Sequence, residues 1–261
     1  MKLSCQEQLL PGETLLQKWD FAEKAGYDAI ELRGKGGYAF RDRLPELRKA
    51  AAAGVPMPTV CVEMPHFIGA FDDDLRADAV EQLRSQLSVI AEIGGRGAMT
   101  PASWGMFSRR LPPFEPPRTE QGDREVLLEA LTDLGAHAEA EGVELYLEPL
   151  NRYEDHMVNR LEQAVDLVRG IPGTRVVADT FHMNIEEDDP AAALEAALPH
   201  VGHIQVSDSN RLQPGAGHLD WRAVLAVLGR YDGYLAVECR LRGEPAAAVA
   251  SIPPFLRGFE S

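Results

Sequence analysis

Several side chains in the second half of the chain could hold a cation or move a proton. Glu148, Asp179 and Glu238 each end a short apolar segment, and His203 and Gln205 lie within another. Successive candidates are about 30 residues apart, roughly one strand–helix unit. Three carboxylates gathered at one place would repel one another unless a cation lay between them. Oxygen-rich ligands with one amide or one imidazole favour Mn²⁺ or Mg²⁺, with Co²⁺ or Zn²⁺ as further options.

The elements that must position these side chains alternate along the whole chain. Short apolar segments, typical of strands buried on both faces, alternate with amphipathic segments of helical period. We expect strands at 3–5, 29–32, 59–63, 97–100, 144–148, 175–178, 201–206 and 234–238. We expect helices at 13–24, 42–53, 74–93, 123–140, 161–168, 190–198, 221–228 and 245–256, and a Pro-rich loop at 109–121.

About eight strand–helix units in 261 residues predict a single-domain (β/α)₈ TIM barrel spanning 1–261, since such barrels take about 250 residues. A doubly wound open sheet is the rival architecture. No GxGxxG sequence follows the first strand and no Walker A motif occurs, which removes the two commonest nucleotide-binding interpretations of an open sheet. In a barrel the candidates would meet at the carboxyl ends of the strands, where active sites form.

Composition narrows the class of function. Lys and Arg total 26 against 41 Asp and Glu, a net charge of −15, which argues against nucleic acid or an anionic membrane as the main partner. The three cysteines contain no CxxC pair, and no apolar run is long enough for a signal peptide or a membrane span. We expect a cytoplasmic protein acting on a small molecule.

Four segments together resemble the sugar isomerase/epimerase superfamily, whose fold is the xylose-isomerase-like TIM barrel. They are LYLEPLNRYE at 145–154, VVADTFHMNIEE at 176–187, VGHIQVSDSNRLQPGAGHLDW at 201–221 and YLAVECR at 234–240, with GYDAIEL at 26–32 as a weaker match. The pattern is closest to ketose 3-epimerases and hydroxypyruvate isomerases. The resemblance implies one catalytic divalent metal and a small sugar or hydroxy-ketone substrate. Relatives often pair through the rim of the barrel, which suggests a homodimer.

The resemblance also implies roles for individual residues. Glu148, Asp179, Gln205 and Glu238 match metal ligands, and Glu148 and Glu238 match the pair that exchanges protons with the substrate. Substrate contacts are implied for His182, Arg211 and Glu154, with Trp104 shaping the pocket. His66 follows the third expected strand and is a further substrate-binding candidate, with a solvated loop position as the alternative.

One position departs from the ketose 3-epimerase pattern. Gln205, in GHIQVSDSNR, stands where those enzymes have a metal-binding His. Hydroxypyruvate isomerases and some dehydroshikimate dehydratases resemble this chain in using Gln, and an amide oxygen favours Mg²⁺ or Mn²⁺ over Zn²⁺. His203 lies two residues earlier, on the same face of the strand and one layer deeper.

The reaction implied is a proton shift beside a carbonyl. One of Glu148 and Glu238 would remove the proton, giving a metal-stabilised cis-enediolate. Return of the proton to the opposite face gives epimerisation, and return to the adjacent carbon gives aldose–ketose isomerisation. A dehydroshikimate dehydratase-like lyase is the alternative. An AP endonuclease-like enzyme fits the acidic composition less well.

Overall fold

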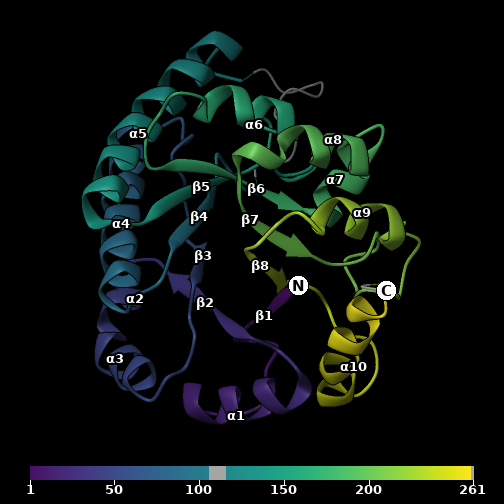
Figure 1. The fold of residues 1–261 in the computed structure, drawn as a ribbon. Coiled ribbons are helices and arrows are strands. Elements are labelled where there is room, and N and C mark those ends of the chain that lie inside the picture. Colours follow the sequence, from purple (N-terminus) through teal and green to yellow (C-terminus); the bar gives the residue numbers. More distant parts are fainter. Residues whose placement is uncertain (106–115, 260–261) are drawn as a thin grey trace.

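Eight parallel strands close into a barrel, and helices surround it (Figure 1). The computed structural model describes residues 1–105 and 116–259. The strands are β1 Lys2–Gln6, β2 Ala29–Lys35, β3 Thr59–Glu63, β4 Gly97–Pro101, β5 Glu144–Glu148, β6 Thr174–Asp179, β7 Val201–Val206 and β8 Tyr234–Val237. Each strand pairs with the next in sequence, and β8 pairs with β1. The predicted (β/α)₈ barrel is therefore confirmed over the open sheet.

The helices follow the expected alternation with two additions. They are α1 Leu15–Ala25, α2 Ala39–Asp42, α3 Leu44–Ala52, α4 Asp73–Glu92, α5 Glu120–Glu141, α6 Leu161–Val168, α7 Thr180–Glu186, α8 Pro190–Ala197, α9 Trp221–Leu228 and α10 Pro245–Arg257. The unpredicted α2 and α7 are one or two turns long, too short for an apolar period to show in the sequence. Part of the predicted loop, 109–115, lies outside the described residues, and α5 begins at Glu120.

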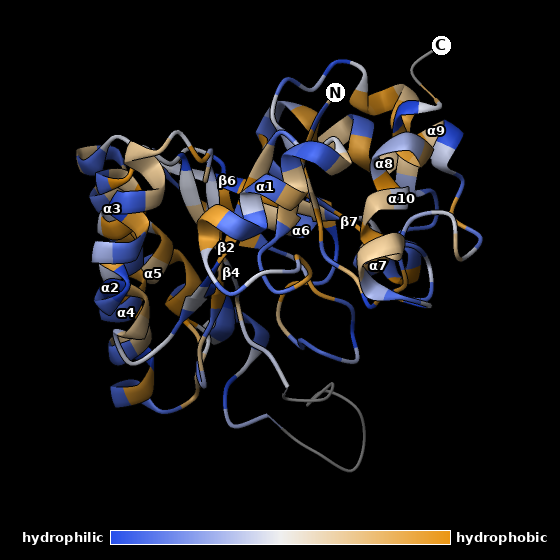
Figure 2. Cartoon of the chain, turned by 90° about the horizontal axis from the view of Figure 1, so that it is seen from below, coloured by the Kyte–Doolittle hydropathy of each residue, from blue (hydrophilic) through white to orange (hydrophobic). Residues whose placement is uncertain are grey.

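Apolar faces of the helices pack against the outside of the barrel. In α4, Leu83, Leu87 and Ile90 recur at three- and four-residue spacing and are fully buried. Figure 2 shows the same division, with apolar residues on one side of the outer helices and hydrophilic residues on the other. Gly26 and Gly142 end α1 and α5 in the left-handed conformation, at φ 97° and 73°, which explains the glycines before β2 and β5.

The amino-terminal part of the barrel interior is filled by side chains. Met99, Tyr146 and Val177 form a buried cluster with Cys61 packed against it. A Cβ atom on Gly97 or Gly202 would lie within 2.7 Å of the Tyr146 ring, so the ring fits only because these two positions carry no side chain. Polar side chains at the opposite, carboxyl end of the strands are therefore the ones that can meet a ligand.

No helix in the described parts of the chain is long and apolar enough to cross a membrane.

Candidate active site

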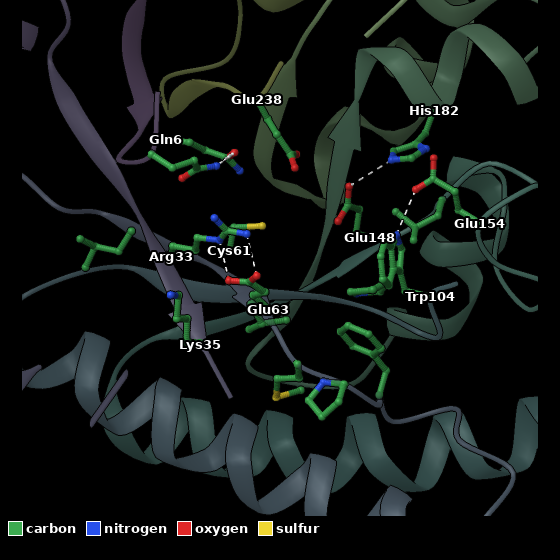
Figure 3. Close-up of a pocket in the computed structure, with 18 of the residues that line it drawn as sticks. Gln6, Arg33, Lys35, Cys61, Glu63, Trp104, Glu148, Glu154, His182 and Glu238 are labelled. Atoms are coloured by element: carbon green, nitrogen blue, oxygen red, sulfur yellow. Dashed lines mark hydrogen bonds and ion pairs between the residues drawn. The ribbon is translucent and has the colours of Figure 1, made fainter. Parts of the chain in front are cut away.

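A cavity of about 650 Å³ opens at the carboxyl ends of the strands (Figure 3). Six of the predicted site residues line it: Trp104, Glu148, Glu154, His182, Arg211 and Glu238. The remaining lining residues are Gln6, Gln8, Leu32, Arg33, Lys35, Cys61, Val62, Glu63, Met64, Pro65, Phe67, Pro101 and Leu150. The barrel thus brings together residues that are more than a hundred positions apart in sequence.

Glu148 is the last residue of β5 and lies close to two other chemically active groups. One potential ligand atom each from Glu148, Asp179 and His182 lies within 4.8 Å of the others, and all three residues are buried. Burial raises the pKa of Glu148 well above its ordinary value, and the neighbouring Glu238 and Asp179 carboxylates raise it further. Glu148 therefore binds a proton more tightly than a free carboxyl group does, and a nearby cation would stabilise its ionised form.

Arg211 links two of the acids. Its Nη1 lies 2.5 Å from Asp179 Oδ2, and its Nη2 lies 3.1 Å from Glu238 Oε2. Burial alone would raise the pKa of Asp179, but the Arg211 guanidinium outweighs it and the pKa is lowered. Glu238 behaves differently, because burial raises its pKa to about 7 even though Arg211 opposes the rise. Near neutral pH the site therefore contains carboxyl groups in different protonation states.

The orientation of His182 follows from its neighbours. Its Nδ1 accepts the Asn151 backbone N–H at 3.0 Å, so the ring proton is on Nε2 when the ring is neutral. Burial lowers the pKa of His182, which favours that neutral form. Nε2 lies 3.8 Å from Glu148 Oε1. His182 therefore presents an N–H donor beside Glu148, which suits contact with a substrate oxygen better than ligation of a metal.

Gln205 is fully buried in β7, directly opposite Asp179 in the strand pairing. Its Nε2 donates to Glu31 Oε1 at 3.0 Å, and its Oε1 has no hydrogen-bond partner among the described residues. A buried amide oxygen without a partner costs free energy unless something else occupies it. The Glu148 and Asp179 carboxylates and this amide are all oxygen donors, and oxygen donors fit a hard divalent cation.

Residues 19–258 match the family described as the xylose isomerase-like TIM barrel. The chain belongs to this family. The match covers all of the strands except β1, and so includes every acid discussed above.

Three proteins similar to this chain are sugar epimerases. The 3-dehydro-D-guloside 4-epimerase of Escherichia coli (strain K12) is 37% identical over 263 residues, covering 98% of this chain and 99% of that protein. The crystal structure of apo 3-keto-D-glucoside 4-epimerase from E. coli superposes with a TM-score of 0.93 at 36% identity, covering 99% of both chains. The D-psicose 3-epimerase of Enterocloster bolteae is 38% identical over 239 residues, covering 84% of this chain and 74% of that protein.

In this xylose isomerase-like barrel, Glu154 and Trp104 form one wall of the cavity. The Trp104 indole N–H donates to Glu154 Oε2 at 3.2 Å, and Asn151 Nδ2 donates to Glu154 Oε1 at 2.9 Å. Trp104 is 58% exposed, so its ring is open to a ligand entering the cavity. Both residues therefore border the cavity, and their contact with a substrate stays a prediction.

His66 lies elsewhere. It is not among the residues lining the cavity, and its Nε2 lies 2.6 Å from Asp78 Oδ2 at the start of α4. Its side chain is largely buried against this partner and lies outside the cavity wall. Gln6 and Glu63 line the cavity although they were not candidates; their position as the last residues of β1 and β3 was the available signal.

Proposed function

We propose that this protein is a divalent-cation-dependent sugar epimerase that inverts C4 of a 3-keto-glycoside. The observation that carries the proposal is that Glu148 and Glu238 face one cavity from β5 and from the end of β8 (Figure 3). Two acids at one cavity can remove a proton from one face of a carbon and return a proton to the other. Similarity to 3-dehydro-D-guloside 4-epimerase over the full length of both chains supports the choice of substrate.

Burial raises the pKa of both acids in the metal-free protein. The pKa of Glu148 is raised well above its ordinary value, and that of Glu238 is raised to about 7. A general base and a general acid work best with pKa values near the working pH. In one direction the ionised member takes the C4 proton while the protonated member delivers its own proton to the opposite face, and the roles exchange for the reverse direction.

Glu148, Asp179, Gln205 and Glu238 would hold the cation, since they supply three carboxylates and the unpartnered amide oxygen of Gln205. When bound, a divalent cation polarises the keto group and offsets the charge that develops on its oxygen. We favour Mn²⁺ or Mg²⁺ because the proposed ligands are all oxygen.

His182 and Arg211 would orient the sugar. The Nε2–H of His182 donates into the cavity beside Glu148, at a position suited to a hydroxyl or keto oxygen. Arg211 has donors left after its contacts with Asp179 and Glu238, because a guanidinium carries five N–H groups. Its guanidinium lies 5.0 Å from the centroid of the Phe181 ring, which restricts its movement.

The test is proton NMR of methyl 3-keto-D-glucoside in D₂O with Mg²⁺-loaded protein. We expect deuterium to enter at C4 and the C4 epimer to appear, with C4 exchange lowered about 10²- to 10⁴-fold in the Glu148→Gln variant. Free ketoses and 3-dehydroshikimate are the comparison substrates. Exchange confined to C3 of a free ketose, or loss of water from 3-dehydroshikimate, would replace the proposal with a ketose 3-epimerase or a dehydratase.

A further inference from the structure

Glu31 is a fully buried carboxylate inside the barrel that the proposed reaction does not use. It lies among four polar side chains from three other strands, and three of them donate hydrogen bonds to it. Its Oε1 accepts from Gln6 Nε2 at 3.1 Å and from Gln205 Nε2 at 3.0 Å. Its Oε2 accepts from Thr59 Oγ1 at 2.7 Å and lies 2.6 Å from His203 Nε2.

These contacts occupy both oxygens of Glu31 as hydrogen-bond acceptors. Oε1 accepts from the NH₂ groups of Gln6 and Gln205, and Oε2 accepts from the Thr59 hydroxyl. Any amide that faces Glu31 Oε1 must therefore present its NH₂ group and turn its oxygen away.

This constraint settles the orientation of Gln205. The two ends of an amide are similar in size, so packing alone selects weakly between them, and a hydrogen-bond partner selects strongly. Reversing the amide would bring the Gln205 oxygen against the Glu31 carboxylate, two acceptors without a proton between them. The end left without a partner among the described residues is indeed the oxygen.

We infer that Glu31 is a positioning residue that fixes the Gln205 amide with its oxygen available to the divalent cation. The inference rests on the cation site of the proposed function and is independent of the sugar. The inference also gives a role to Glu31, the glutamate of the GYDAIEL segment, and to His203, which lies one layer deeper than Gln205. Neither residue lines the substrate cavity.

Two conservative variants separate orientation from charge. Glu31→Gln loses the charge but keeps an oxygen for Gln205, because its new NH₂ group can face the Thr59 hydroxyl. Glu31→Asp keeps the charge but is one methylene shorter, which withdraws the acceptor from Gln205. Thr59→Val is the matched control, since it removes one contact to the other oxygen of Glu31 and leaves Gln205 paired.

The measurement is the Kd for Mn²⁺, by electron paramagnetic resonance of the free ion and without sugar, together with thermal unfolding. We expect Glu31→Asp to weaken Mn²⁺ binding about 10- to 100-fold, as changes around metal ligands usually do. We expect Glu31→Gln and Thr59→Val to stay within about threefold of the wild type, whatever their effect on stability.

The reverse order, with Glu31→Gln weakened and Glu31→Asp unchanged, would show that Glu31 acts through its charge and would overturn the inference. Equal losses in all three variants would show a merely structural role, also against it. If Glu31→Asp does not fold, a tenfold loss in Glu31→Gln alone overturns the inference and retention supports it. Absence of Mn²⁺ binding by the wild type removes both the inference and the cation site, whereas absence of C4 exchange with this Mn²⁺ pattern removes only the proposed substrate.

Discussion

Arg211 forms ion pairs with two acids of the site, Asp179 and Glu238, and the cost of removing it can be calculated. Its side chain is 21% exposed and makes close contacts with Asp179 and Glu238. Hydrogen bonds to charged groups contribute roughly 1.5–3 kcal/mol each, and breaking a largely buried ion pair costs roughly 3–5 kcal/mol. We therefore expect Arg211→Met, which keeps most of the apolar stem, to lower the free energy of unfolding by about 3–5 kcal/mol.

The loss is measurable as a fall in Tm. At roughly 2–4 °C per kcal/mol for a chain of this size, the metal-free variant should unfold about 6–20 °C below the wild type. The assay is thermal unfolding in EDTA at pH 8, where Glu238, with its pKa of about 7, is ionised. Arg33→Met is the matched control, because the Arg33–Glu63 pair is 41% and 45% exposed and such pairs contribute about 0–1 kcal/mol.

Mn²⁺ should reverse the effect. Arg211 occupies carboxylate oxygens that a cation would use, so its removal should lower the Kd for Mn²⁺ while it destabilises the metal-free protein. Mn²⁺ at a hundred times its Kd stabilises a folded protein by about 2.7 kcal/mol, and the variant should gain more than the wild type at equal concentration. An unchanged metal-free Tm, or an equal Mn²⁺ shift in both proteins, would refute the reasoning.

Three further predictions concern the acids and Gln205. Glu148→Gln should lower C4 exchange about 10²- to 10⁴-fold, as loss of a general acid–base group does. The variant should not lower Tm, because the amide replaces a carboxyl group whose ionised form burial disfavours. Proton NMR measures the exchange, and thermal unfolding measures Tm. Because the pKa of Glu238 is raised, the folded protein binds the Glu238 proton more tightly than the unfolded chain does. The free energy of unfolding of the metal-free protein should therefore fall by up to roughly 3 kcal/mol as pH rises from 4.5 to about 7. Urea titrations across that range should show the fall, and Glu238→Gln should flatten it. Gln205→His should shift the cation preference from Mn²⁺ toward Zn²⁺ in competition binding, since imidazole is the softer ligand; an unchanged preference would remove Gln205 from the ligand set.

The strands were predictable because strands buried on both faces leave continuous apolar runs. The bounds of β3, β5 and β7 coincide with the segments expected from the sequence. The α7 helix was not predictable in the same way, because Asp179 both ends β6 and caps α7 by accepting the Phe181 N–H at 2.7 Å. A residue that ends one element and begins the next leaves no loop in the sequence to separate them.

The candidate site was predictable to the level of strand ends and no further. Spacing and resemblance brought Glu148 and Glu238 to one cavity, where the structure places them. Neither could show that Glu31 and Gln205, 174 residues apart, share a hydrogen bond across the barrel. Such contacts depend on the register and tilt of strands around the closed sheet, and one sequence does not carry that information in any local pattern.

The Tyr146 ring and the side chains packed against it fill the amino-terminal end of the barrel interior. Sugar, water and cation then share the opening at the carboxyl ends of the strands, so a product must leave before the next substrate can enter. Product and substrate of an epimerase differ at one carbon and should compete for this shared route with similar affinities. Net flux would then follow the ratio of the two epimers in the surroundings, and the direction of turnover would be set by whichever reactions supply one epimer and remove the other.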